Sequence, residues 1–357
     1  MCSGKLKLAQ TTLYAGVLAK MGAERSLLLS ESKLRMLTET RNLTELTTQL
    51  RETSYQQQIA KVTPPLTSRK LERALTENLI ETYIKIIKNS PKNAAAFLRL
   101  YLLRFEVENI KALIKAANAN LSPEQKLGKI YSSAETYLKR RVVIEEAGKV
   151  PDLKQTVNAL KGTEYASALK MGLGSYEEDG STTCLDVLLD KHFYEKLCES
   201  YQALPRMEKP HANYYVSMEN DGFVLLTLLR GKYLHYDPNW LRLAVPTKKF
   251  NLSDETVETI VTAQDFDSAL KIALDSHYTQ FFVKAQSPEE TVANAEKAFR
   301  RALFLHVKES RFTEIFNVGV ILAFLTQKEA EVHNLTAVSL GVEAGLKPEE
   351  IQRQLLL

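Results

Sequence analysis

The side chains of this sequence that could do chemistry are charged residues spaced about one helical turn apart. Asp186, Asp190, His192 and Glu195 fall on one predicted helix, and carboxylates with an imidazole are ligands that divalent metals accept. Asp186 and Asp190 share a face because they are four residues apart, whereas His192 points elsewhere. A solvated acidic face beside Lys191 is therefore the favoured interpretation, and a metal-dependent helical enzyme is an alternative.

The sequence patterns of known nucleotide-binding and hydrolytic sites are absent. It has no GxxxxGK[ST], GxSxG or HExxH, and Gly172-x-Gly174 does not continue as GxGxxG. Cys2, Cys184 and Cys198 form no CxxC pair and are odd in number, so we expect a reducing compartment rather than a disulfide framework. For Cys184 and Cys198 we expect buried thiols. We predict no catalytic residue, no cofactor and no metal.

Composition restricts the class of protein. The 357 residues are 45% hydrophobic and 25% charged, which is typical of a globular protein, and 14 glycines and 11 prolines are few for a β-sandwich or barrel. The net charge of +4 is too small to indicate nucleic-acid binding. The segment Lys85–Arg141 carries +8, which would suit an acidic partner or an anionic lipid face; ordinary solvated helix faces are the alternative. The most apolar stretch, Val318–Leu325, is too short for a membrane span, and we expect the isolated chain to be soluble.

The elements that must position these residues are helices. Apolar residues recur at helical spacing nearly throughout, and Asn213–Val216 is the one weak candidate for an extended segment. Several helix starts are marked by a capping residue followed by proline, which tolerates the first helical turn. These pairs are Ser90-Pro91, Ser122-Pro123, Asp237-Pro238 and Ser287-Pro288.

The chain repeats one helical segment three times. Glu106–Glu124 (EVENIKALIKAANANLSPE) resembles Glu331–Glu349 (EVHNLTAVSLGVEAGLKPE), and a third copy between them ends at Trp240. When the copies are aligned on their prolines, two positions share a property. The first holds a small residue in every copy, so we expect another backbone to approach closely there. The second, four positions later, holds a residue that tolerates the left-handed conformation. The small residues are Ala116, Gly231 and Gly341, and the left-handed candidates are Asn120, His235 and Gly345.

A second segment repeats before each of these helices. Asn42–Ile59 matches Asp152–Leu169 at a spacing of 110, including the pair Tyr55 and Tyr165, and a weaker third copy runs from Ile260 through Phe266 to Leu270 with one extra residue. The sequence therefore predicts an all-α protein of three similar helical bundles, with domains at 1–128, 129–245 and 246–357. Such units could close into a pseudo-threefold body or stack in a line.

The repeated helix carries basic residues in two of its three copies. Lys111 and Lys115 share a face, Arg230 aligns with Lys115, and Lys232 follows it. The third copy has Leu340 and Val342 at the corresponding places. If the three helices line a common centre, two of them present positive charge to it; the alternative is ordinary solvated side chains.

Three segments together resemble a known family. They are LYAGVLAKMGAERSLLLSESKLRMLTETRNLTELTTQL (Leu13–Leu50), LDVLLDKHFYEKLCES (Leu185–Ser200) and EVHNLTAVSLGVEAGLKPEEIQRQL (Glu331–Leu355). Their order and spacing are similar to those of the C subunits of archaeal A-type (A/V-type) ATP synthases, the counterparts of the d subunits of vacuolar ATPases. The similarity covers nearly the whole chain, including the threefold repeat.

The resemblance implies three helical domains arranged as a pseudo-threefold funnel. The funnel would sit peripherally on the cytoplasmic face of the cell membrane, on the ring of proteolipid (K or c) subunits, and receive the D and F subunits of the central stalk. Such a protein is a rotor adaptor that transmits torque for coupling ATP turnover to ion transport and has no active site of its own. By position and chemistry, Lys111, Lys115, Arg230 and Lys232 are the candidates for the stalk-binding cavity. A helical-repeat scaffold that binds other proteins is the alternative.

Overall fold

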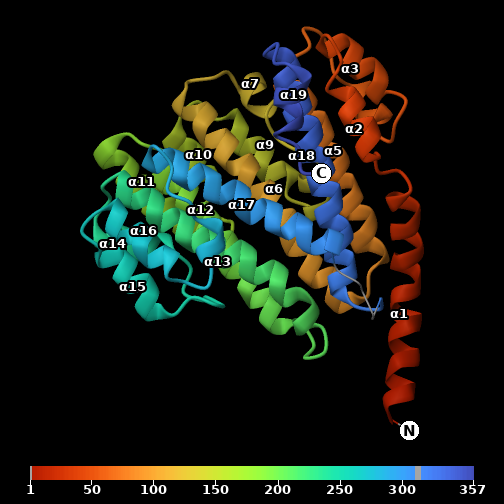
Figure 1. The fold of residues 1–357 in the computed structure, drawn as a ribbon. Helices are drawn as coiled ribbons and strands as arrows, with labels where there is room; N and C mark the ends of the chain where they lie inside the picture. The colour runs from red at the N-terminus through yellow and green to blue at the C-terminus, as the bar shows by residue number, and fades with distance from the viewer. Residues whose placement is uncertain (1, 310–314) are drawn as a thin grey trace. The chain divides into compact units, whose positions relative to one another are not determined.

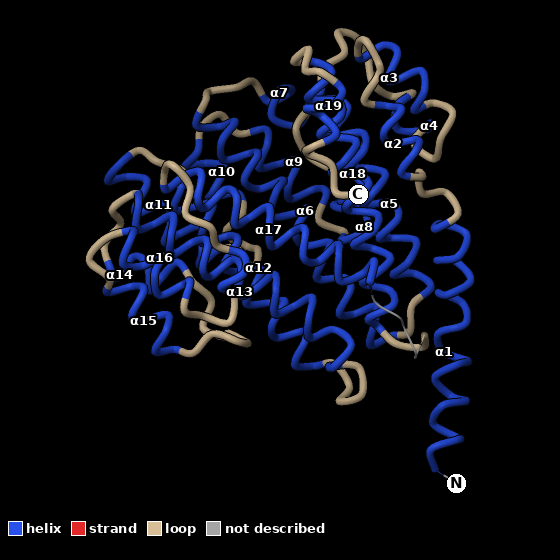
Figure 2. Tube along the Cα trace, viewed as in Figure 1, coloured by secondary structure: helices blue, strands red, loops and turns tan. Residues whose placement is uncertain are grey.

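The computed structural model describes residues 2–309 and 315–357, and every regular element in these ranges is helical (Figure 2). This confirms the all-α prediction. The helices are α1 (Cys2–Arg25), α2 (Glu31–Leu37), α3 (Leu43–Leu50), α4 (Gln56–Ile59), α5 (Ser68–Asn89), α6 (Lys92–Asn118), α7 (Pro123–Leu127), α8 (Ser132–Leu138), α9 (Arg141–Lys149), α10 (Leu153–Ala159), α11 (Ala166–Asp179), α12 (Thr183–Ala203), α13 (Lys209–Tyr233), α14 (Pro238–Ala244), α15 (Asp254–Thr262), α16 (Phe266–Leu274), the 3-10 helix η1 (Thr279–Phe281), α17 (Pro288–Glu309), α18 (Val318–Glu343) and α19 (Pro348–Gln352).

The suggestion of an extended segment at Asn213–Val216 is wrong, because these residues lie inside α13. Ala212, Tyr215 and Val216 are all buried, so burial along one helical face outweighs the preference of tyrosine and valine for strands.

Three of the four predicted caps are confirmed, including Ser287, which accepts from the N–H of Glu290 in the first turn of α17 at 3.1 Å. The Ser122 and Asp237 side chains accept hydrogen bonds from backbone N–H groups in the first turns of α7 and α14. The prediction for Ser90 is wrong, because its hydroxyl donates to the Ile86 carbonyl at the end of α5.

The described chain forms two compact units. Unit 1 contains Met1–Leu102, Tyr131–Tyr137 and Phe304–Leu357, and unit 2 contains Leu103–Ile130 and Leu138–Leu303. The compact units are thus not the sequence repeats, because α18, which belongs to the third copy, packs in the unit that holds the first. The domain boundaries at 128 and 245 stay a prediction.

Unit 1 is built around two long neighbouring helices from distant parts of the sequence. Helix α18 lies beside α5 (Figure 1), and α1, α2 and α3 pack against α18 as well. Leu75 and Ile86 of α5 and Ile321 and Leu335 of α18 are fully buried. Burial of these side chains is the main stabilising term for the unit, since a fully buried leucine or isoleucine contributes about 1.5–3 kcal/mol.

Unit 2 packs its core around α13. Helix α12 contacts α11 and α13, and α13 in turn contacts α14, α15 and α16. Leu225 and Leu229 of α13 join Leu241, Ile260 and Phe299 in one apolar cluster. Cys184 and Cys198 of α12 are buried free thiols, as the sequence predicted for both.

The three copies of the long helix end in the same way. Asn120, His235 and Gly345 have φ values of 53°, 59° and 67°, which confirms the predicted left-handed ends. In each copy the next residue donates its N–H to a carbonyl five residues back: Leu121 to Ala116 at 3.0 Å, Tyr236 to Gly231 at 2.9 Å and Leu346 to Gly341 at 2.9 Å.

The structure gives a different reason from the predicted one for the glycines at the small-residue position of the long helix. A Cβ atom added to Gly231 would overlap the Leu241 side chain, and one added to Gly341 would overlap Ile351. The neighbour is therefore a side chain of the following short helix, ten residues on, and not another backbone. The glycine lets that helix fold back onto the end of the long one.

Candidate functional site

The predicted basic pair and the predicted acidic helix meet in unit 2. Lys111 of α6 places its Nζ 2.9 Å from Oδ1 of Asp190 in α12 and 2.7 Å from Oε1 of Glu108. One turn further, Lys115 Nζ lies 2.7 Å from Asp186 Oδ2. Both helices space their charges by four residues, so two ion pairs one helical turn apart join α6 to α12.

The pair involving Lys111 is largely enclosed, since its side chain is 12% exposed. Burial alone would lower the pKa of Lys111, but the carboxylates of Asp190 and Glu108 outweigh burial and hold that pKa well above its usual value. Burial raises the pKa of Asp190 to about 6 against the opposing attraction of Lys111. The ion pair is therefore formed at neutral pH, and Lys111 is already neutralised by the protein's own groups.

The two basic residues of the second copy lie in different surroundings. Arg230 is 43% exposed and forms an ion pair with Glu296 of α17. Lys232 is buried, and its ammonium donates to the carbonyl oxygens of Val261 at 2.6 Å and Ala263 at 2.7 Å, at the end of α15. Burial lowers the pKa of Lys232. Its hydrogen bonds give it a structural task, the capping of a neighbouring helix end.

Of the four sequence candidates, Lys115 and Arg230 are the ones whose charge a partner can reach. Their side chains are 56% and 43% exposed, whereas Lys111 and Lys232 are enclosed. Each accessible base already holds a carboxylate on a neighbouring helix. An acidic partner would therefore have to compete with Asp186 or Glu296 for them.

The residues considered for a metal site are dispersed among other partners. Asp186 and Asp190 face Lys115 and Lys111, Glu195 lies 3.6 Å from Lys191, and His192 contacts Glu164. Among the described residues no group of three or more His, Cys, Asp or Glu side chains has the arrangement of a metal site. Nothing in this region gives support to the metal-dependent enzyme.

The sequence reasoning missed a buried polar contact that occurs three times, which we call the tyrosine–carboxylate links. The hydroxyl donors are Tyr165, Tyr278 and Tyr55, and the acceptors are Glu106 at 2.8 Å, Asp221 at 2.9 Å and Glu331 at 2.6 Å, respectively. All six residues are at most 5% exposed. A buried carboxylate is costly unless it is hydrogen-bonded, so each link meets a requirement set by burial.

A sequence signal for the links existed. The three acids stand at one aligned position, seventeen residues before Pro123, Pro238 and Pro348. Each tyrosine follows a hydroxyl residue by two positions, and that hydroxyl (Thr53, Thr163 or Ser276) accepts from the tyrosine N–H and donates to a carbonyl three residues back. The placement of the third copy at Phe266 is therefore wrong: Tyr278 has the contacts of Tyr165.

The links connect the repeats in a cyclic order. The acid of the first copy receives the tyrosine of the second, the acid of the second receives that of the third, and Glu331 of the third receives Tyr55 of the first. Each of these contacts lies inside one compact unit. The long helix of each repeat thus supports the short helices of the next.

The acids of the three links differ in their other partners. Glu331 also lies 2.9 Å from the ammonium of Lys328, which itself donates to the Tyr55 hydroxyl at 2.8 Å. Glu106 lies 3.3 Å from Arg140, and Asp221 instead accepts from the backbone N–H groups of Phe250 and Asn251. Burial, with the neighbouring carboxylate, raises the pKa of Tyr55 well above its usual value, so the phenol stays protonated and donates.

Around Glu106 the link extends to a surface network. Arg140 also lies 2.5 Å from Glu164 Oε1, and His192 Nε2 lies 3.4 Å from Glu164 Oε2. The hydrogen bond from His192, together with Arg140, lowers the pKa of Glu164 to about 2. Glu164 is therefore ionised over the whole physiological range and holds Arg140 beside the buried Glu106.

Comparison with known proteins places this arrangement in a family. The family described as ATP synthase (C/AC39) subunit matches residues 17–354. The chain is 27% identical to the C subunit of the A-type ATP synthase of Methanocaldococcus jannaschii over 350 residues, covering 96% of this chain and 86% of that protein. It is 28% identical to the protein of the same name from Thermococcus onnurineus, covering 96% and 89%, and 26% identical to that from Pyrococcus abyssi, covering 96% and 90%.

The region that matches the family contains all three tyrosine–carboxylate links. The family region begins within α1 and ends after α19, so it includes all three copies of the long helix and all six residues of the tyrosine–carboxylate links. In the part of the chain that the structure describes, no helix is long and apolar enough to cross a membrane. The chain belongs to the ATP synthase (C/AC39) subunit family.

Proposed function

We propose that this protein is the non-catalytic rotor adaptor, the C subunit, of an A/V-type ATP synthase. It joins the D and F subunits of the central stalk to the proteolipid ring and transmits torque between them, and it lies peripherally at the cytoplasmic face of the membrane through that ring. The observation that carries the proposal is the family match over residues 17–354, supported by relatives named as C subunits of A-type ATP synthases.

The physical properties of the chain suit this task. Torque transfer requires a body that does not deform, and close-packed helical interiors have low compressibility. The buried links add polar contacts that require defined geometry, because a displaced tyrosine would leave a carboxylate unpaired. The funnel that the family resemblance implies, and the contact of its cavity with the stalk, remain part of the proposal.

Lys115 and Arg230 are our candidates for direct contact with the stalk. The test is the double charge reversal Lys115→Glu with Arg230→Glu in the full chain, co-expressed with tagged D and F subunits. Charged contacts set the orientation of a complex and its rate of formation. We expect the wild-type chain to co-purify with the stalk and the double variant to be depleted at least tenfold, with little change in thermal stability.

A matched control comes from two other ion-paired bases. Lys149, paired with Glu146, is 55% exposed, and Arg242, paired with Glu258, is 43% exposed, so they match Lys115 and Arg230 in both exposure and pairing. The double variant Lys149→Glu with Arg242→Glu should bind the stalk like the wild type. Absence of any association of the wild-type chain with D, F or the ring would overturn the proposed function. Equal loss in both double variants would show that general charge, and not these two positions, matters.

A further inference from the structure

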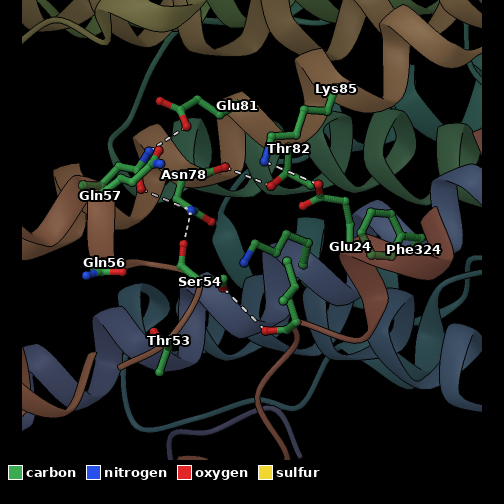
Figure 3. A pocket seen from close by; sticks show the side chains of 13 residues that line it. Glu24, Thr53, Ser54, Gln56, Gln57, Asn78, Glu81, Thr82, Lys85 and Phe324 are labelled. Atoms are coloured by element: carbon green, nitrogen blue, oxygen red, sulfur yellow. Dashed lines mark hydrogen bonds and ion pairs between the residues drawn. The ribbon is translucent and has the colours of Figure 1, made fainter. Parts of the chain in front are cut away.

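A polar cavity lies inside unit 1, beside the link between Tyr55 and Glu331. Its volume is about 250 Å³, and its walls come from α1, the α4 segment, α5 and α18 (Figure 3). Four amides and three hydroxyls line it together with four charged side chains, Glu24, Glu81, Lys85 and Lys328. Such a lining is suited to a small polar ligand and not to an apolar one.

Lys328 brings a buried cation with unused donor capacity to the wall. Its ammonium has three N–H groups, of which the Tyr55 hydroxyl takes one at 2.8 Å and Glu331 another at 2.9 Å. No acceptor among the described residues takes the third. The ammonium also lies 4.1 Å from the centre of the Tyr55 ring, but a ring face is a weaker acceptor than an oxygen atom, so an acceptor inside the cavity would complete its hydrogen bonding.

Lys85 supplies a second ammonium to the same space. It lies 3.4 Å from Glu24 in an ion pair that Figure 3 marks, and its side chain is 47% exposed. Burial lowers the pKa of Lys328, attraction by Glu331 and Glu24 opposes that shift, and the positive charge of Lys85 adds a smaller lowering effect. Both ammonium groups line the same cavity, so one ligand with several acceptor atoms could contact them together.

The carboxylates of the lining do not fill this place. Glu24 is shared between Lys85 and Lys20, which lies 3.3 Å away, and Glu81 accepts from the Gln58 amide at 2.6 Å. Glu331 is committed to the link with Tyr55. Among the described residues, none of these acids accepts the third N–H of Lys328, and Lys85 has N–H groups beyond its ion pair with Glu24.

We propose that this cavity binds a small oxyanion, a phosphate or carboxylate group, between Lys85 and Lys328. An oxyanion presents several acceptor atoms and can take hydrogen bonds from both ammonium groups at once. The cavity is below the roughly 300 Å³ of the smallest pockets for drug-sized ligands, so a single phosphate or a small organic acid fits and a nucleotide does not. Binding would join α5 to α18. The inference does not depend on the proposed function.

The test is calorimetric titration of the full chain with inorganic phosphate and, separately, with acetate, at constant ionic strength set by chloride. We expect one saturable site, and Lys85→Met should weaken it at least tenfold because a hydrogen bond to a charged group contributes about 1.5–3 kcal/mol. Lys85→Arg, which keeps the charge, should retain binding. Binding of phosphate without acetate, or the reverse, supports the site and identifies the chemical source.

Two further variants separate the cavity from general charge. Glu24→Gln removes the acid that competes for Lys85 and should tighten binding severalfold. Lys33→Met removes a lysine of the same unit that bonds Gln49 outside the cavity, and should leave binding unchanged. The proposal is overturned if neither anion shows saturable binding, which leaves a cavity that holds water, or if Lys85→Met binds as tightly as the wild type.

Discussion

Replacing each linking tyrosine by phenylalanine tests whether the three buried links contribute to stability in the way their partners indicate. The change removes one hydroxyl and keeps the packed ring. A hydrogen bond to a charged group contributes about 1.5–3 kcal/mol, and the loss is larger when the charge keeps few other donors. The structure therefore predicts an order among Tyr55, Tyr165 and Tyr278, and not one common value.

Tyr55→Phe should be the most destabilising of the three. Its hydroxyl both donates to Glu331 and accepts from Lys328, so two buried charges each lose a partner, although Glu331 keeps Lys328 and the N–H of Leu29. We expect a loss of about 3–4 kcal/mol in the free energy of unfolding of the unit that contains this link. Lys328 keeps the face of the ring, 4.1 Å from its centre, which limits the loss.

The other two links should lose less. In Tyr165→Phe, Glu106 keeps Arg140 at 3.3 Å, and we expect a loss of about 2 kcal/mol. In Tyr278→Phe, Asp221 keeps the N–H groups of Phe250 and Asn251. A further contact that is lost, from the Asn251 side-chain amide at 3.1 Å, is uncharged, so the loss should be about 1–2 kcal/mol.

Urea unfolding, followed by hydrogen exchange at amides of α5 and of α13, assigns each loss to its unit. Tyr201→Phe is the control, because its hydroxyl also bonds a side chain, Asn213 at 3.0 Å, but at an exposed site, and should change stability by less than about 0.5 kcal/mol. The reasoning is refuted if Tyr278→Phe is the most costly variant, or if all three match the control.

Two more predictions follow from single sites. Folding lowers the pKa of Glu164 from 4.5 to about 2. The ionised carboxylate therefore adds at most about 3 kcal/mol to the free energy of unfolding. This stabilisation is complete above roughly pH 5.5 and is lost as the pH falls toward 2. The difference in unfolding free energy between wild type and Glu164→Gln should therefore shrink between pH 5.5 and 2.5, and a constant difference would contradict the assigned cause. Gly341→Ala should lower the free energy of unfolding by about 1–3 kcal/mol, because the added methyl group would overlap the Ile351 side chain. In the double variant, Ile351→Val should recover part of that loss. If thermal unfolding shows that the two losses simply add, the contact is not their cause.

The helical architecture and the helix ends were predictable because they depend on local rules. The left-handed residues at Asn120, His235 and Gly345 follow from which residue types tolerate positive φ, and the caps at Ser122 and Asp237 follow from which side chains accept from a first helical turn. Both rules act within a few residues, so the sequence contains all the information they need.

The charge pairing was not predictable in the same way. The sequence identified Lys111 and Lys115 as one basic face and Asp186 and Asp190 as one acidic face. It predicted a cavity wall for the first and a solvated surface for the second, and did not pair them. Their pairing depends on α6 packing against α12, and a helical period does not state which helices become neighbours. Lys232 shows the same limit, because a lysine with its ammonium on buried carbonyls has the same sequence pattern as an exposed one.

The cyclic order of the links has a consequence for how the fold is stabilised. Each repeat carries one acid on its long helix and one tyrosine in its short helices. That tyrosine donates its hydrogen bond to the acid of the repeat before it, so no repeat contains both residues of one link. A repeat cut out alone would leave one carboxylate and one phenol without partners, besides an exposed apolar face, and repeats of this kind depend on their neighbours for stability. The link between Tyr55 and Glu331 joins residues 276 positions apart, so loss of α18 would remove the partner of the first repeat's short helices as well as the third repeat's core. The stability of unit 1 therefore depends on residues from both ends of the chain.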